Sequence, residues 1–435
     1  MTTRDSRMTR GRGRKYGFGV ISRFLGFQGL SQVLGVITGL AVIRSLDKVD
    51  YAQYALITSM LAAMTLLSES GVTSGLMSRG ASIIKDSGRL GHLFSTALRF
   101  RRVVGILAII LGDSVLLTLL LHTGASPLMA SIYILFVALT FVPILTKGIL
   151  EPYFRLAGTF QVLQRVTLAS GALRLFAVGV LLLGNAVTIS SLLFAGLVCA
   201  AFEVWQLRRK SREAFNLKLA VNQDDVTLFK SNLLETLPMN LVLVAQGQLL
   251  YLFIGFFGST LVLAEIAALS RLAILFVILN AVVIDIGTGV VARALPNRRS
   301  VRRAMGPFLG GFLFLALVIV AIIYIFATPL VWILGPGYDN LQTALVIVAV
   351  GTAAINLGDT LRMLNQARGW LKGSWVFVPL TAIWASVGLC LLDLTSLSQA
   401  AIFMTLQAVP ALATQTVCFV LGYRALNAKA EDIDL

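Results

Sequence analysis

The chain has 435 residues, of which 57% are hydrophobic and only 13% are charged, with a mean hydropathy of +0.87. Soluble globular domains carry about 25% charged residues, so this composition excludes a soluble globular protein. The formal net charge is +16. In a soluble chain that excess would suggest nucleic acid as a partner, but here the basic residues stand between apolar runs, which argues against nucleic acid.

The cysteines and histidines predict neither a metal site nor a disulfide. Cys199, Cys390 and Cys418 lie in apolar runs without a C-x-x-C spacing, and His92 and His122 stand alone. Small buried side chains account for cysteines in such positions, and an isolated histidine is a poor metal ligand. We therefore expect no metal and no cofactor.

Twelve apolar runs are each long enough to cross a bilayer, which requires about 20 residues. Runs of this length exceed barrel strands, so they predict helices. The expected fold is an all-α integral membrane protein with twelve transmembrane helices in two six-helix bundles around a central cavity. The expected spans are residues 18–43, 52–78, 103–121, 128–147, 160–184, 187–207, 229–257, 260–291, 305–333, 341–363, 373–392 and 398–423.

The connections between the runs alternate between basic and neutral. One side, which includes residues 1–15 and the expected loop 79–102, holds 31 of the 36 basic residues, whereas the other has only Arg44 and Lys48. The positive-inside rule then places both termini in the cytoplasm, and we expect a multi-pass protein of the bacterial inner membrane. Residues 17–43 are too long an apolar segment for a signal peptide, so we interpret them as an uncleaved first span.

The longest polar connection divides the chain into two halves of six expected spans. We expect an N-terminal bundle over residues 1–207, a cytoplasmic linker over residues 208–228 and a C-terminal bundle over residues 229–435. Two such halves are typical of transporters built from structural repeats. The prediction depends on topology alone, because the halves share no strong residue-level repeat.

Three basic residues, Arg23, Arg174 and Arg271, are counted on neither side and lie within expected spans. Arg23 is near the end of the first span, where its side chain can extend to the interface, whereas Arg174 and Arg271 are each ~16–21 Å from an end of their spans at ~1.5 Å per residue. Charges at that depth are costly and face a bundle interior or a wet cavity. One interpretation is a structural ion pair with a residue such as Glu265; the other is a cationic site for an anionic ligand.

Polar residues on other expected spans extend the candidate site. In the first span, Gln28 and Gln32 share one helical face with two glycines, and such faces contact other helices rather than lipid. Asp359 and Arg362 are three residues apart on one face and are expected to form an ion pair. The candidates for gating or ion coupling are Glu69, Glu235, Glu265, Asp359 and Arg362.

Motifs for catalysis are not apparent. The chain has no nucleotide-binding loop of the Gly-x-x-x-x-Gly-Lys-Ser/Thr type, no Ser/His/Asp set and no stretch long enough for a catalytic domain outside the membrane. We therefore expect a carrier and not an enzyme.

The stretch from Ile43 to Ala81 resembles the start of the polysaccharide flippases, the Wzx-like translocases of the multidrug/oligosaccharidyl-lipid/polysaccharide exporter superfamily. That family shows an Arg-x-Leu-Gly turn, a Tyr-Gly-x-Tyr and an acidic-x-Gly before a basic residue. Here Asp47 and Ala52 replace glycines of the pattern, and Glu69, expected inside a continuous span, takes the acidic place. The matching segments are residues 41–46, 51–54, 66–72 and 78–79.

The resemblance implies transport of an undecaprenyl-pyrophosphate-linked oligosaccharide from the inner to the outer leaflet by alternating access, for O-antigen, capsule or exopolysaccharide synthesis. The expected partners are this lipid-linked oligosaccharide, membrane lipids, a polysaccharide polymerase and a chain-length regulator. The resemblance suggests Arg23, Arg174, Arg271, Gln28 and Gln32 for substrate binding, while coupling to H⁺ or Na⁺ would require one of the carboxylates. The alternatives are a multidrug or organic-cation exporter, a lipid II flippase and a non-transporting polysaccharide-assembly protein.

Overall fold

The structure is a computed structural model that describes most of residues 27–431. The positions outside the described residues are 1–26, 28, 70, 85, 213, 218, 273–275, 277–278, 281–286, 288–289, 292–293, 296, 336–337, 339, 371 and 432–435. Arg23 and Gln28 are therefore outside the described part of the chain.

The described residues form helices joined by short turns, with no strand among them. The first helix is Gly29–Ser45. The others are α2 (Lys48–Glu69), α3 (Val72–Ile83), α4 (Ser87–His122), α5 (Pro127–Leu156), α6 (Phe160–Leu183), α7 (Ile189–Ser211), α8 (Gln223–Phe257), α9 (Thr260–Leu272), α12 (Arg298–Ile325), α13 (Ala327–Leu334), α14 (Gln342–Ala367), the 3₁₀ turn η2 (Ser374–Val376), α15 (Phe377–Leu391), α16 (Leu397–Leu406) and α17 (Ala408–Glu431).

The prediction of an all-α protein that spans the membrane about twelve times is confirmed. Nine helical segments among the described residues are long and apolar enough to cross a bilayer. The first helix, α8 and α9 occupy the remaining three expected spans. The expected second span is divided between α2 and α3, and the expected ninth between α12 and α13.

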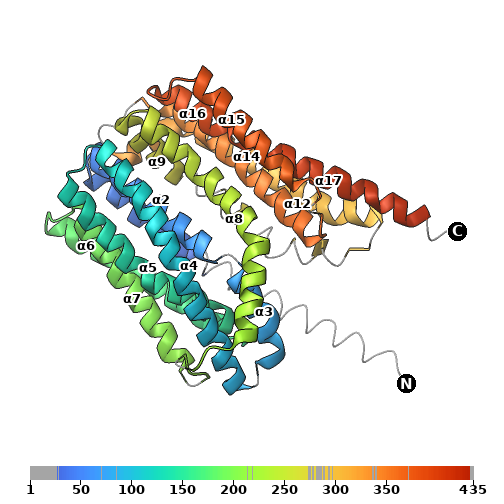
Figure 1. Ribbon diagram of the computed structural model, residues 1–435. Coiled ribbons are helices and arrows are strands. Elements are labelled where there is room, and N and C mark those ends of the chain that lie inside the picture. The colour runs from blue at the N-terminus through green and yellow to red at the C-terminus, as the bar shows by residue number, and fades with distance from the viewer. Residues whose placement is uncertain are drawn as a thin grey trace, which may run out of the picture.

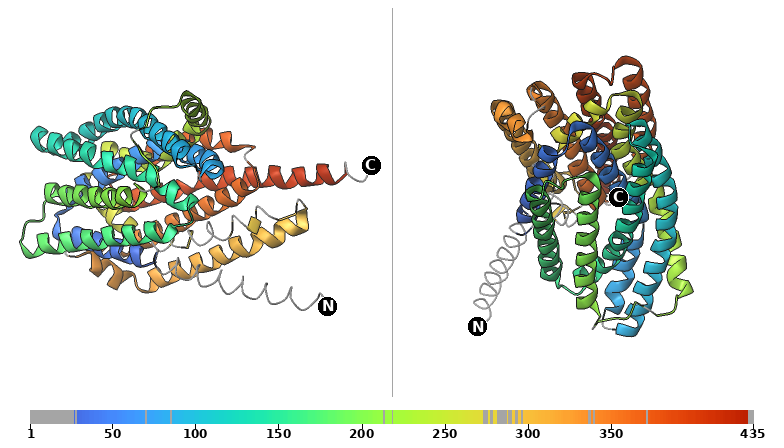
Figure 2. Two further views of the ribbon diagram at one scale, coloured as in Figure 1. Left: turned by 90° about the horizontal axis from the view of Figure 1, so that it is seen from below. Right: turned by 90° about the vertical axis from the view of Figure 1, so that its left-hand side faces the viewer.

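The helices form two groups that approach each other at one end of the molecule (Figure 1). Helices α2 to α7 make up one group, α12 to α17 the other, and α8 runs between them, packing on α2, α3 and α4. The helices run roughly parallel, and α17 extends past its neighbours (Figure 2). The division of the chain at residues 207 and 229 stays a prediction.

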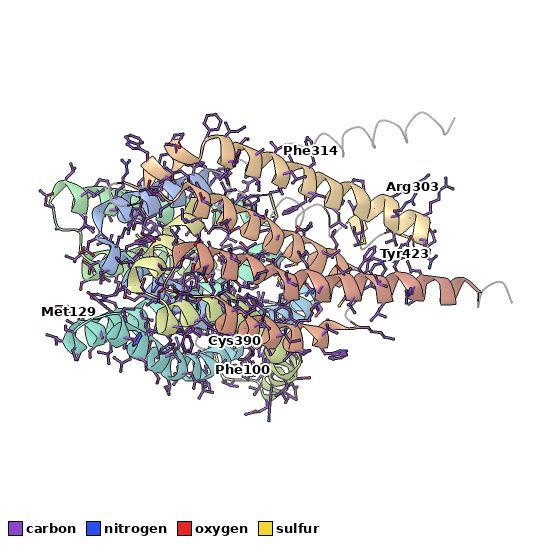
Figure 3. All side chains as sticks on the ribbon, turned by 90° about the horizontal axis from the view of Figure 1, so that it is seen from above. Phe100, Met129, Arg303, Phe314, Cys390 and Tyr423 are labelled. Atoms are coloured by element: carbon purple, nitrogen blue, oxygen red, sulfur yellow. The ribbon has the colours of Figure 1, made fainter. Side chains whose placement is uncertain are left out.

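The two ends of the molecule are named here by their turns. The neutral end holds residues 46–47, 123–126, 184–188 and 392–396, and the basic end holds residues 86, 157–159, 212, 214–217, 219–222 and 368–370. Figure 3 shows Met129 near the neutral end, and Arg303 and Tyr423 near the opposite end. The two groups of helices separate toward the basic end (Figure 1).

The expected loop over residues 79–102 is largely helical, which corrects the prediction. Helix α4 begins at Ser87, is capped by the Asp86 side chain and continues for 36 residues, or ~54 Å at ~1.5 Å per residue. The helix that contains the expected span 128–147 is also longer than that span, because α5 continues to Leu156. Charged residues end an apolar run without ending a helix, since arginine and lysine are good helix formers.

The expected continuous helix through Glu69 is also corrected. Helix α2 ends at Glu69, and Gly71 precedes α3 with a left-handed backbone, φ 72°. A Cβ atom on Gly71 would lie 2.5 Å from the backbone carbon of Asn232 in α8. Glycine at this position therefore permits both the break in the helix and the close approach of α8.

The connection between α7 and α8 is fixed to the N-terminal group. The Ser95 hydroxyl donates to the carbonyl oxygen of Leu219 at 2.6 Å, and the backbone N–H of Asn222 donates to the Thr96 hydroxyl at 3.0 Å. Phe215 is buried, and its ring centroid lies 4.7 Å from that of Phe94. This connection is therefore a packed segment and not a free tether.

Replacing Gly71 with alanine is expected to destabilise the protein. A left-handed backbone costs a residue with a side chain about 1–2 kcal/mol, and the new Cβ would also collide with α8. The midpoint of thermal unfolding of the detergent-purified chain should fall. Gly179→Ala in α6 is the matched control, because nothing lies within 4 Å of its Cβ position. Equal midpoints for the two variants would contradict the proposed role of Gly71.

Reporter fusions test the orientation in the membrane. We expect green fluorescent protein fused after Ala220 to fluoresce in the cytoplasm and alkaline phosphatase fused after Gly335 to be active in the periplasm, because these residues lie at the basic and neutral ends. The reciprocal fusions serve as controls. An active phosphatase at Ala220 together with a fluorescent fusion at Gly335 would reverse the orientation.

Candidate functional site

A cavity of about 840 Å³ lies mainly within the N-terminal group of helices. The first helix, α2, α5, α6 and α7 form its walls, and Arg271 reaches it from α9 in the second half of the chain. One stripe of α2 faces it, at spacings of three or four residues that follow the helical repeat. This stripe comprises Tyr54, Thr58, Leu61, Thr65 and Glu69.

The part of the cavity toward the neutral end is cationic. Arg174 donates from Nη2 to the Tyr54 hydroxyl at 3.0 Å. Arg271 lies within electrostatic reach of the Tyr51 and Tyr54 hydroxyls, and its Cδ is 4.0 Å from the Cβ position of Gly39. Both arginines are accessible through the cavity. This cationic end is therefore built from both halves of the chain.

Neither arginine of the cationic end forms an ion pair with a described carboxylate. Glu265, the partner that the structural interpretation offered, instead binds Lys48, with Nζ 2.5 Å from Oε1. The described neighbours of Arg174 and Arg271 are neutral phenols, which accept hydrogen bonds but carry no charge at neutral pH. Two guanidinium groups thus face the same cavity with their charge uncompensated by the described residues.

The part of the cavity toward the basic end contains balanced charges. Lys147 of α5 lies 2.8 Å from Glu203 of α7, and Glu203 also accepts a hydrogen bond from Thr167 at 3.2 Å. Glu69, at the end of α2, accepts from Thr73 at 2.9 Å. An ammonium beside a carboxylate leaves little net field at a distance, so this end attracts a charged ligand less than the cationic end does.

Arg101 is a buried cation just behind the balanced end. Its side chain is 1% exposed, and Nε and Nη1 have no hydrogen-bond partner among the described residues. Glu69 and Glu151 are within electrostatic reach. A Cβ atom on Gly148 would collide with Nη1, so this glycine provides the space that the guanidinium occupies.

The two halves are joined at the neutral end by a latch, defined here as Arg44 and Lys48 with their partners. Arg44 donates from Nε to the carbonyl oxygen of Ile333 at 2.7 Å and from Nη2 to that of Trp332 at 3.0 Å. These carbonyls end α13, where the helix dipole favours a cation. The guanidinium also lies over the Trp332 ring, 5.2 Å from its centroid.

Lys48 completes the latch. Besides binding Glu265, it lies 5.2 Å from the centroid of the Tyr338 ring. Burial, with help from the nearby Tyr51 and Glu265, raises the pKa of Tyr338 above its ordinary value, so the ring remains a neutral phenol beneath the ammonium. The only two basic residues expected on the neutral side thus both bind the opposite half.

The remaining candidates are distributed as follows. Gln32 lines the cavity from the first helix. Asp359 and Arg362 form the expected ion pair on α14, with Nη2 3.1 Å from Oδ1, away from the cavity-lining residues. Glu235 falls in α8, but its side chain is outside the described residues, as are Arg23 and Gln28. The structure therefore brings Gln32, Glu69, Arg174 and Arg271 to one cavity and places Glu265 in the latch.

Sequence reasoning missed Lys147, Glu203, Tyr51 and Tyr54 as cavity residues. Lys147 is the last residue of the expected span 128–147, and Glu203 lies within the expected span 187–207, where nothing in the local sequence marks it as a cavity residue. One available signal was the four-residue spacing of Lys147 and Glu151, which indicates a continuing helix. The contacts of Glu203 with α5 and α6 have no local signal, because they join helices that are distant in sequence.

Comparisons with known proteins find matches in structure only. No protein-family model and no curated protein matches the sequence. An inward-facing multidrug resistance MATE family transporter of the MOP superfamily is similar at a TM-score of 0.74 and 13% identity, covering 92% of this chain and 96% of the other. The lipid II flippase MurJ in an inward closed conformation is similar at 0.71 and 12%, covering 92% and 88%.

A further similar structure is a MOP superfamily transporter from Pyrococcus furiosus whose binding pocket is described as having reverse polarity, suggesting a different function. The TM-score is 0.66 at 13% identity, covering 93% of this chain and 94% of the other. The chain has the fold of MOP-superfamily transporters. Together with its apolar helices, this fold makes it a multi-pass membrane protein. At such low identity the likeness concerns the fold, and function depends on the site.

Loss of the latch ion pair is expected to open the neutral end. A partly exposed pair contributes up to about 1 kcal/mol, which corresponds to about a fivefold change in population. Cys199 lines the cavity and serves as the probe in a Cys390→Ser, Cys418→Ser background. With Glu265→Gln, a membrane-impermeant maleimide added outside intact cells should label Cys199 several-fold faster.

Two further variants make this latch experiment specific. The exchange Lys48→Glu with Glu265→Lys should restore slow labelling, because it re-forms the pair with reversed charges. Asp393→Asn, in an exposed turn at the same end, is the matched control and should leave the rate unchanged. Equal labelling of Cys199 in Glu265→Gln and the parent protein would rule out a latch at this pair.

Proposed function

We propose that the chain is a flippase that moves an undecaprenyl-pyrophosphate-linked oligosaccharide from the inner to the outer leaflet of the bacterial inner membrane, for surface polysaccharide synthesis. The observation that carries the proposal is the cationic end of the cavity, where Arg174 and Arg271 face the same space and neither pairs with a described carboxylate. A charged side chain this deep in the membrane costs free energy, so its presence indicates a functional site.

A pyrophosphate is the ligand chemistry that this arrangement suits. A guanidinium donates two parallel hydrogen bonds to phosphate oxygens and stays charged when desolvated. Among the described residues, the cavity lining contains three cations, Arg174, Arg271 and Lys147, and two carboxylates, Glu69 and Glu203, which leaves a net charge of +1. Since Lys147 and Glu203 neutralise each other at 2.8 Å, the excess positive charge belongs to the arginines.

Alternating access is the mechanism that the latch and the fold support. The latch joins the halves at the neutral end, while the helices separate toward the basic end, which we assign to the cytoplasm with both termini. In the proposed cycle, the cargo enters from that side, the latch opens and the cargo leaves on the other. Glu69, Glu235 and the pair Asp359–Arg362 are proposed for gating or for coupling to H⁺ or Na⁺. A polymerase and a chain-length regulator are proposed as partners.

Two other functions known for transporters with this fold compete with the proposed one. A lipid II flippase would also bind a lipid-linked pyrophosphate, so the cationic end is compatible with it, and the nature of the sugar distinguishes the two. A multidrug exporter for organic cations requires a cavity in which acidic and aromatic residues outweigh the arginines, whereas the described lining of this cavity has a net positive charge.

A third alternative is a non-transporting polysaccharide-assembly protein, which would have no use for the latch.

Ligand binding tests the proposal directly. Farnesyl pyrophosphate is the probe for a lipid-linked pyrophosphate, and farnesol is the same lipid without the anion. We expect the detergent-purified chain to bind farnesyl pyrophosphate and not farnesol. Arg174→Ala with Arg271→Ala should weaken this binding at least about a hundredfold, because each charge-assisted contact contributes about 1.5–3 kcal/mol. Arg271→Lys should retain part of it, since lysine keeps the charge without the bidentate geometry.

Arg303→Ala is the matched control, because this arginine is exposed near the start of α12, and it should leave binding unchanged. In cells, Arg271→Ala at normal protein levels should abolish export of the surface glycan. Tighter binding of tetraphenylphosphonium than of farnesyl pyrophosphate, or unchanged pyrophosphate binding in the arginine variant, would contradict the proposal and favour the cation exporter.

A further inference from the structure

The middle of the cavity, between the cationic end and the balanced end, is lined by hydroxyl groups whose protons are already in use. Thr58 donates to the carbonyl oxygen of Tyr54 at 3.0 Å, and Thr65 donates to that of Leu61 at 2.7 Å. Thr38 donates to Leu34 at 2.7 Å in the same way. Ser170 donates to the carbonyl oxygen of Cys199 at 3.4 Å, across the α6–α7 contact.

A hydroxyl that donates its proton to the backbone retains only its lone pairs for a ligand. Serine and threonine each have one donor and two acceptor sites, so these four residues present acceptors to the cavity. Thr167 adds a fifth, because its proton goes to Glu203. The middle of the cavity therefore favours ligand groups that donate hydrogen bonds, whereas the cationic end favours ligand groups that accept them.

The charges near these acceptors are balanced, which limits the kind of ligand group that can donate hydrogen bonds to them. Glu203 is neutralised by Lys147 at 2.8 Å, and Glu69 lies within electrostatic reach of Arg101. A ligand ammonium would thus gain little here, because Glu203 is ion-paired and Glu69 lies near the cationic Arg101, and a ligand carboxylate would be repelled by the oxygen lone pairs. Neutral hydroxyl groups fit best, because they donate without adding charge.

The acceptors extend away from the arginines along one face of α2. Tyr54 and Thr65 are eleven residues apart on that face, or ~16 Å at ~1.5 Å per residue. Arg174 binds Tyr54, so a ligand whose anionic group is held at the cationic end places the following groups beside Thr58 and then Thr65. This order matches a molecule with an anionic head attached to a hydroxyl-bearing chain.

We propose that Thr58 and Thr65 form a subsite for neutral sugar units next to the pyrophosphate, which selects neutral sugars over acidic ones. The inference deepens the proposed function and rests on it, because the arginines must hold the pyrophosphate for the sugars to reach α2. It adds a specificity that the arginines alone would not give, since cations on their own would favour acidic sugars.

Three probes separate the subsite from the cationic end: farnesyl pyrophosphate, its glucose conjugate farnesyl-pyrophosphoryl-glucose, and the matched conjugate of glucuronic acid. Each is titrated against the detergent-purified full chain by calorimetry. We expect the glucose conjugate to bind about tenfold more tightly than the glucuronic acid conjugate. Thr58→Val with Thr65→Val should weaken the glucose conjugate about tenfold, because two acceptors are lost, and should leave farnesyl pyrophosphate within about twofold.

The control is Thr118→Val in α4, which removes the same type of intrahelical bond, here to Ser114 at 3.0 Å, on an exposed face away from the cavity lining. It should change none of the three affinities. Unchanged binding of farnesyl pyrophosphate by the double valine variant also demonstrates that this variant is folded.

The outcomes distinguish failure of the subsite from failure of the proposed function. Equal or tighter binding of the glucuronic acid conjugate, or parallel weakening of farnesyl pyrophosphate and the glucose conjugate in the double valine variant, overturns the subsite alone. Failure of the parent protein to bind any pyrophosphate probe overturns the proposed function and the subsite together.

Discussion

Positive charge inside a membrane-spanning bundle, with no described carboxylate paired to it, is the constraint around which this protein is arranged. Such a charge requires polar contact and access to water, and the cavity supplies both through the tyrosines of α2 and the surrounding hydroxyls. Because Arg271 belongs to the second half and Arg174 to the first, the cationic end exists only while the halves are together. In the proposed transport cycle, a movement that separates the halves at this level would also take the site apart and so would couple release of the cargo to the conformational change.

Much of this arrangement was predictable because it depends on hydrophobicity and on the depth of charges. Apolar runs of sufficient length predicted the helices, and the distances of Arg174 and Arg271 from the ends of their spans predicted that both face an interior. The spacing of Asp359 and Arg362 predicted their ion pair, which is present. These inferences need only the regular rise of a helix and the cost of burying a charge, which operate on one segment at a time.

The rest depends on contacts between distant segments. Whether Glu265 pairs with an arginine or with Lys48 is decided by how α9 packs against the start of α2. Gly71 breaks the helix where α8 approaches. Arg101 lies in the basic sequence Arg99-Phe100-Arg101-Arg102 but is buried, because Gly148 leaves room for it. The fold itself does not identify the cargo, since similar structures include a multidrug MATE transporter and a lipid II flippase. Chemistry is assigned by the side chains that line the cavity.

The packed connection between α7 and α8 has a consequence for biogenesis. Its described contacts with Phe94, Ser95 and Thr96 all lie earlier in the chain, so a nascent chain that has reached residue 222 already contains the surface on which this connection docks. Domains tend to fold as units during synthesis, beginning at the N-terminus. The first half can therefore assemble in the membrane and anchor the beginning of α8 before the later helices are translated. The second half then joins a platform that is already formed, and the latch, whose partners come from residues 265 to 338, can be completed only after the chain has reached residue 338.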